Sequence, residues 1–218
     1  RDCLLSRGLG DVYKRQVMNF GILCVQGIVN SFGTVIMAAF AVAVKIDTIA
    51  YMPVQDFGNA FSVFVAQNYG AKNLARIRYG VGRASLINIV LSIFMAIVMH
   101  FWGANIVELF IGSVSPDVIK IAHDYLWIST IFYFFLGQIF IFRNALQGMG
   151  RPLIPLTSSF AELMVRSFAA VYLAVKFSYY GIFYAGPIAW VTASVIVALG
   201  YYINIRRLIM KKRKARSI

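Results

Sequence analysis

The run VIMAAFAVAVKIDTIAYMPVQDFGNAFSVFVAQNY, residues 35–69, decides the fold class. It is apolar over most of its length, and at about 1.5 Å per residue an α-helix of this run would extend about 50 Å. The hydrocarbon core of a bilayer is about 30 Å thick, so one helix of this length spans it only if it is tilted or bent. We therefore predict a membrane-spanning helix, with a kink near Pro53.

The composition of the whole chain points to the same class of protein. Of its 218 residues, 60% are hydrophobic and 13% are charged, whereas soluble domains carry about 25% charged residues. A soluble domain of this size could not bury so much apolar surface. The composition excludes a cytosolic enzyme, a disordered chain and a secreted disulfide scaffold, and it predicts an all-α polytopic protein embedded in the lipid bilayer.

Further apolar runs lie on both sides of the first. We predict six transmembrane helices, at about residues 17–30, 35–69, 84–111, 125–146, 152–177 and 182–210, and a basic tail at 211–218. Residues 1–16, RDCLLSRGLGDVYKRQ, have no apolar periodicity and look like a translated sequencing-adapter string. We interpret them as a non-native scar, so the first helix is expected to be clipped and the native amino-terminal part to be missing.

The basic residues predict an orientation in the membrane. The net charge is +13, but Lys and Arg gather in short clusters between the apolar runs, which is typical of the positive-inside rule and not of a nucleic-acid binder. One side carries Lys72, Arg76, Arg78, Arg83, Arg151, Arg206, Arg207 and the tail. The other carries only Lys120 and Lys176. We expect a multi-pass protein of the inner (plasma) membrane with a cytoplasmic carboxyl terminus.

Four polar residues of the second helix form a stripe. Asp47, Tyr51, Gln55 and Asn59 recur every four residues and share a drifting face. Ionisable groups inside a membrane are costly, which makes this face a candidate for a water-filled cleft that carries substrate and ion. A packed polar seam inside the bundle is the alternative. Asp56 is a further candidate, on the opposite face unless Pro53 redirects it.

The other helices offer fewer polar candidates. Gln26 and Asn30 share a face of the first helix and are expected either to join the cleft or to hydrogen-bond to neighbouring helices. Lys45 is expected to be satisfied by neighbouring helices.

Three charged residues of the later helices are predicted to be structural. Glu162 and Arg166 are spaced for an ion pair within one helix, and Arg143 is expected to extend toward the cytoplasmic headgroups.

We find no catalytic constellation and no metal-ligand spacing, since His100 and His123 are isolated. No enzyme activity, cofactor or metal is predicted.

Two stretches resemble one transporter family. Residues 20–73, which end in AQNYGAKN, and residues 142–167, which contain LQGMGRP, resemble the multidrug and toxic compound extrusion (MATE) transporters. The resemblance covers about residues 17–207 and implies the carboxyl-terminal six-helix lobe of a twelve-helix protein, with the amino-terminal lobe as its missing partner. It also implies export of amphipathic or cationic small molecules in exchange for H⁺ or Na⁺ by alternating access.

One departure from the family bears on the coupling ion. Sodium-coupled members are described with an acidic cation site between the seventh and tenth helices, but residues 125–146 contain no acidic residue, and neither does the remaining first helix. We therefore favour H⁺ over Na⁺, or an ion site in the missing lobe.

Two other functions stay open. A related lipid-linked saccharide flippase would need a cavity lined by several arginines, and the helices offer only Arg143 and Arg166. A purely structural membrane protein would have no polar stripe.

Overall fold

The structure is a computed structural model that describes residues 23, 25–112 and 115–214. This part of the chain consists of helices and short turns, without strands, which confirms the predicted all-α class. Residues 25–30 are helical, whereas the rest of the predicted first helix and the interpreted scar at 1–16 lie almost entirely outside the described residues.

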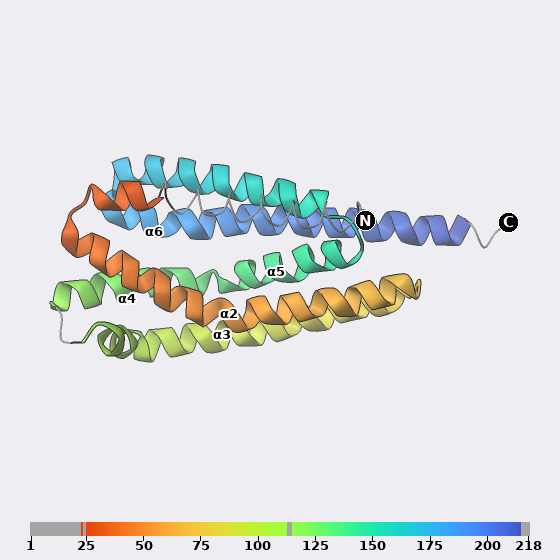
Figure 1. Ribbon diagram of the computed structural model, residues 1–218, viewed down its shortest axis with the longest axis horizontal. Coiled ribbons are helices and arrows are strands. Elements are labelled where there is room, and N and C mark those ends of the chain that lie inside the picture. The colour runs from red at the N-terminus through yellow and green to blue at the C-terminus, as the bar shows by residue number, and fades with distance from the viewer. Residues whose placement is uncertain (1–22, 24, 113–114, 215–218) are drawn as a thin grey trace, which may run out of the picture.

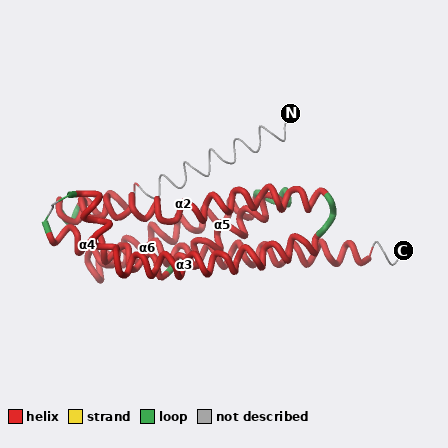
Figure 2. The backbone as a smooth tube through the Cα atoms, turned by 90° about the horizontal axis from the view of Figure 1, so that it is seen from below, coloured by secondary structure: helices red, strands yellow, loops and turns green. Residues whose placement is uncertain are grey.

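The helices form an elongated bundle. They are α2 (Thr34–Gly70), α3 (Leu74–Ile111), α4 (Pro116–Ile131), α5 (Tyr133–Gly148) and α6 (Leu153–Lys214). Figure 1 shows most of their length running along the long axis of the molecule, and Figure 2, from a perpendicular direction, shows most of the loops near the two ends. α2 continues through Pro53 without a break.

α6 is a helical hairpin, because the chain reverses at Ser178. This residue has non-helical dihedrals (φ 56°, ψ −148°), and Figure 1 shows the two arms running in opposite directions. The arms touch at more than one level: the Ser158 hydroxyl donates to the Ala193 carbonyl at 3.3 Å, and Gly200 packs against Ile154. We call residues 153–177 the first arm of α6 and residues 179–214 its second arm.

The long helices have the dimensions of membrane spans. By length and hydropathy, α2, α3 and α6 each qualify, and α4 with α5 qualifies as a fourth if this pair, bent by 52°, is one span. Large apolar side chains such as Phe101, Leu109 and Val175 are exposed on the outside of the bundle, as expected where helices face lipid.

Helix boundaries differ from the predicted runs in two places. α3 begins at Leu74, ten residues before the predicted start at 84, because Asn73 caps it by accepting a hydrogen bond from the Arg76 amide at 3.2 Å. The predicted helix at 125–146 begins earlier, at Pro116, and is broken at Phe132 into α4 and α5. The basic loop of residues 74–83 is thus helical, and so is most of the polar connection before residue 125.

Small residues let α2 and α5 approach closely. A Cβ at Gly148 would lie 2.6 Å from the Ser62 carbonyl oxygen, and one at Gly58 would lie 2.9 Å from Asn144 Nδ2. Without a side chain at either position, the two backbones pack tightly against each other. This packing places Asp47 of α2 beside the break between α4 and α5.

Candidate functional site

A cavity of about 240 Å³ lies inside the bundle, between α2, α4, α5 and both arms of α6. We call it the central cavity. Its polar lining residues are Asp47, Thr48, Tyr51, Gln55, Arg143, Glu162 and Arg166. Apolar and aromatic residues, among them Phe40, Tyr125 and Trp190, form much of the remaining wall.

Asp47 is held against the break in the α4–α5 helix. Its side chain is buried, with 4% of the residue exposed, and its Oδ1 accepts a hydrogen bond from the Tyr133 hydroxyl at 2.7 Å. Tyr133 is the first residue of α5, directly after the break, and its ring packs edge-on against Trp190 of the second arm of α6. One carboxylate therefore links α2 to the point where the α4–α5 helix bends.

A second polar group joins α5 to α6. The Glu162 carboxylate accepts from Arg143 Nη2 at 3.1 Å and from Arg166 Nη2 at 2.8 Å. The predicted Glu162–Arg166 pair is present, but it is part of a triad. The expected extension of Arg143 toward the headgroups is wrong: its side chain is 4% exposed, because a buried carboxylate on the neighbouring helix binds it.

The predicted stripe on α2 reaches the cavity only in part. Asp47, Tyr51 and Gln55 line the central cavity, and the Tyr51 ring stacks on Phe140 at a centroid distance of 6.2 Å. Asn59 is exposed and lies outside the cavity lining. The four-residue spacing drifts around the helix, so the fourth member leaves the shared face.

The remaining candidates also lie outside the central cavity. Lys45 and Asp56 of α2 are exposed, as are Gln26 and Asn30. The helix that carries Gln26 contributes Val25 to the lining instead. A role for Asp56, Gln26 and Asn30 in a cleft between two lobes stays a prediction. Lys45 was expected to be buried against neighbouring helices, but it is exposed.

Sequence reasoning missed two residues of the site. Tyr133 is one of many aromatic residues in an apolar run, and only the fold brings its hydroxyl to Asp47, 86 positions away. Thr48 lines the cavity beside Asp47; its position within the polar stretch of α2 was an available signal.

The charges of the central cavity suit an exchange reaction. Two carboxylates face two guanidiniums, so the site is formally neutral when all four groups are ionised. Glu162 binds both arginines, whereas Asp47 accepts its hydrogen bond from a neutral hydroxyl. A proton on Asp47 would give the cavity an excess positive charge, and its loss would restore an anion that attracts cations. Among the described residues, no group of three or more His, Cys, Asp or Glu is arranged to hold a metal ion.

The comparisons with known proteins all indicate the same family. The MatE family model matches residues 16–173. Two curated relatives come from Bacillus subtilis: "Probable multidrug resistance protein YoeA" is 25% identical over 202 residues, covering 91% of this chain and 43% of the relative. "Probable multidrug resistance protein YpnP" is 28% identical over 148 residues, covering 67% of this chain and 33% of the relative.

Solved structures share the fold. The Vibrio cholerae MATE transporter VcmN in its bent form superposes with a TM-score of 0.85 at 19% identity, covering 92% of this chain and 46% of that one. An outward-facing multidrug resistance MATE transporter of the MOP superfamily gives a TM-score of 0.83 at 14% identity, covering 94% of this chain and 45% of that one. The chain thus spans less than half the length of these relatives.

Proposed function

This chain belongs to the MatE family, and on that premise we propose that it is one six-helix lobe of a secondary active transporter that exports amphipathic or cationic compounds in exchange for protons. The curated relatives named above are described as multidrug resistance proteins. The proposed partner is a second lobe of similar size, since solved transporters of the fold are about twice as long as this chain.

The observation that carries the proposal is the buried carboxylate of Asp47 in the wall of the central cavity. Desolvation makes an isolated buried charge costly, so Asp47 gains from binding either a proton or a cationic compound. The two compete for the same oxygen atoms. In the proposed cycle the carboxylate takes up a proton from the outside, releases it when the cavity faces the cytoplasm, and then accepts the exported cation.

The direction of transport follows from the proposed orientation. The turns that carry Lys72 and Arg151 lie at the same end of the bundle as the last described turns of α6 (Figure 1). The positive-inside rule assigns this end to the cytoplasm. Export then requires the cavity to open alternately to the two sides, and we propose that this lobe rocks against its partner lobe to do so.

The flippase alternative is less well supported by the geometry. Arg143 and Arg166 do reach the central cavity, but both donate to Glu162. Binding a pyrophosphate through these guanidiniums would require breaking the buried triad. We therefore favour a cationic substrate over a lipid-linked pyrophosphate.

The test is transport in proteoliposomes with an imposed pH gradient, using the transporter that contains this lobe and tetraphenylphosphonium as the probe cation. We expect Asp47→Asn to insert normally and to lose proton-driven transport by at least tenfold, because an amide cannot exchange a proton near neutral pH. Glu108→Gln is the matched control, because Glu108 is an exposed carboxylate on α3 that lies outside the lining of the central cavity. Equal rates for the two variants, normalised to inserted protein, would refute the role of Asp47.

A further inference from the structure

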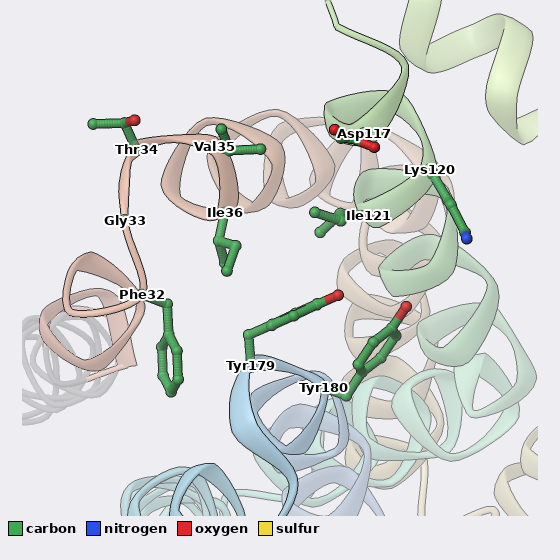
Figure 3. A pocket seen from close by; sticks show the side chains of 10 residues that line it. All are labelled: Phe32, Gly33, Thr34, Val35, Ile36, Asp117, Lys120, Ile121, Tyr179 and Tyr180. Atoms are coloured by element: carbon green, nitrogen blue, oxygen red, sulfur yellow. The ribbon is translucent and has the colours of Figure 1, made fainter.

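A second cavity, of about 530 Å³, lies at the end of the bundle where α6 reverses. We call it the end cavity. It forms where the turn before α2, the first turns of α4 and the reversal of α6 meet, as Figure 3 shows. The lining residues used below are Phe32, Ile36, Asp117, Lys120, Tyr179 and Tyr180.

One buried aromatic ring contacts the linings of both cavities. Phe183, on the second arm of α6, is 1% exposed. Its ring packs edge-on against Tyr125, which lines the central cavity, at a centroid distance of 5.4 Å. It also packs edge-on against Tyr179 and Tyr180, which line the end cavity, at 5.9 and 5.6 Å. A single phenyl ring thus stands between the two linings along this line of contacts.

The side chains packed around Phe183 are apolar. Its apolar cluster reaches both cavities. Phe40 and Ile182 of the cluster line the central cavity, and Phe32 and Ile36 line the end cavity. A side chain can change rotamer without displacement of a helix. The barrier between the cavities is therefore of a kind that side-chain movement can open.

We infer that the end cavity is the mouth of a passage through this lobe to the central cavity, that Phe183 closes the passage, and that the passage takes amphipathic organic cations. The substrate class rests on the proposed function. The passage itself rests on the two cavities and on the aromatic contacts that join them.

The mouth favours positive charge. Tyr179 and Tyr180 stack at a centroid distance of 4.5 Å, and Figure 3 shows their side chains reaching from α6 toward α4. Aromatic faces attract organic cations. The carboxylate of Asp117 lines the cavity, and that of Asp124 accepts from the Tyr180 hydroxyl at 3.0 Å. Against these two anions stands Lys120, so the charge of the three groups together is −1.

The passage can be tested without measuring transport. A single cysteine is placed at Thr48, in the lining of the central cavity, with Cys3 and Cys24 replaced by Ser. A membrane-impermeant methanethiosulfonate reagent is then added on the side of the end cavity. We expect Phe183→Ala to raise the rate of labelling at least tenfold. Phe61→Ala, which removes a ring from a different apolar cluster, is the matched control and should leave the rate unchanged.

A block at the mouth gives the complementary measurement. Ile36→Trp places a large ring in the lining of the end cavity, and we expect it to slow labelling both with Phe183 intact and in Phe183→Ala. The effect of Ile36→Trp with Phe183 intact tests the passage even if Phe183→Ala folds poorly. Equal labelling in Phe183→Ala and Phe61→Ala, or rates that Ile36→Trp does not change, would overturn the passage.

Charge selectivity tests the substrate class. We expect the cationic trimethylammonium reagent to label faster than the anionic sulfonate reagent, after correction for their reactivity with free thiols, and Asp117→Asn to reduce this ratio severalfold. A ratio near one, or one that Asp117→Asn leaves unchanged, would overturn the preference for cations. Labelling requires no proton exchange, so a failed passage and a failed role of Asp47 give separate results.

Discussion

Replacing Glu162 by Gln should destabilise the fold strongly, because it leaves two guanidiniums without their shared counter-charge. The Glu162 oxygens lie 3.1 and 2.8 Å from the two Arg nitrogens, and one such pair is worth about 5 kcal/mol at an effective dielectric constant of about 20. Desolvation offsets much of that attraction, but removing one partner of a buried pair costs about 3–5 kcal/mol. Arg143 is 4% exposed and cannot regain water, whereas Arg166, at 22%, partly can. We expect a loss of about 3–4 kcal/mol.

Two comparison variants isolate this effect. Arg166→Gln leaves the Glu162–Arg143 pair in place and should cost about 1 kcal/mol, because Arg166 is partly exposed. The double variant Arg143→Met with Glu162→Gln removes the most buried charge and should be more stable than Glu162→Gln alone. Unfolding by SDS in mixed micelles, followed by tryptophan fluorescence, measures all three. A cost of Glu162→Gln no larger than that of Arg166→Gln, or a double variant no more stable than Glu162→Gln alone, would refute the reasoning.

Three further predictions use the same protein preparation or intact cells. Ser178→Gly should stabilise the fold by up to about 1 kcal/mol in the SDS titration, since φ 56° with ψ −148° suits glycine better than serine; a loss of stability would contradict this. Gly137→Ala should cost about 1–3 kcal/mol, because the new methyl group would meet the side chain of Asn88; a neutral result would contradict the packing. An impermeant thiol reagent outside the cell should label Lys120→Cys and not Arg151→Cys, and the reverse pattern would invert the orientation.

Much of the fold follows from hydropathy and spacing. The apolar run at 35–69 agrees closely with α2, and the predicted all-α membrane class and family resemblance are confirmed. Hydropathy, however, locates the part of a helix that suits lipid, whereas hydrogen bonding sets where the helix ends. The cap at Asn73 therefore starts α3 ten residues before the apolar run, and the break at Phe132 lies within a run that is uniformly apolar.

The candidate site, too, could be predicted from the sequence only in part. The four-residue spacing predicts a shared face for Asp47, Tyr51 and Gln55, and these three residues line the central cavity; their role in a cleft between two lobes stays a prediction. The partners of the buried charges lie on other helices, and their choice depends on packing that one sequence does not reveal. Arg143 was expected to reach the headgroups by its position near a helix end, but Glu162 of the adjacent helix offers it a buried carboxylate.

Proton release on binding of a cation tests the exchange at Asp47 most directly. The purified transporter is mixed with tetraphenylphosphonium in weakly buffered detergent solution, and the pH change is followed with an indicator dye. If proton and cation compete for the Asp47 carboxylate, the wild type releases up to one proton per bound cation at pH values where Asp47 is protonated, and Asp47→Asn releases none. Equal proton release by Asp47→Asn and the wild type would contradict the account.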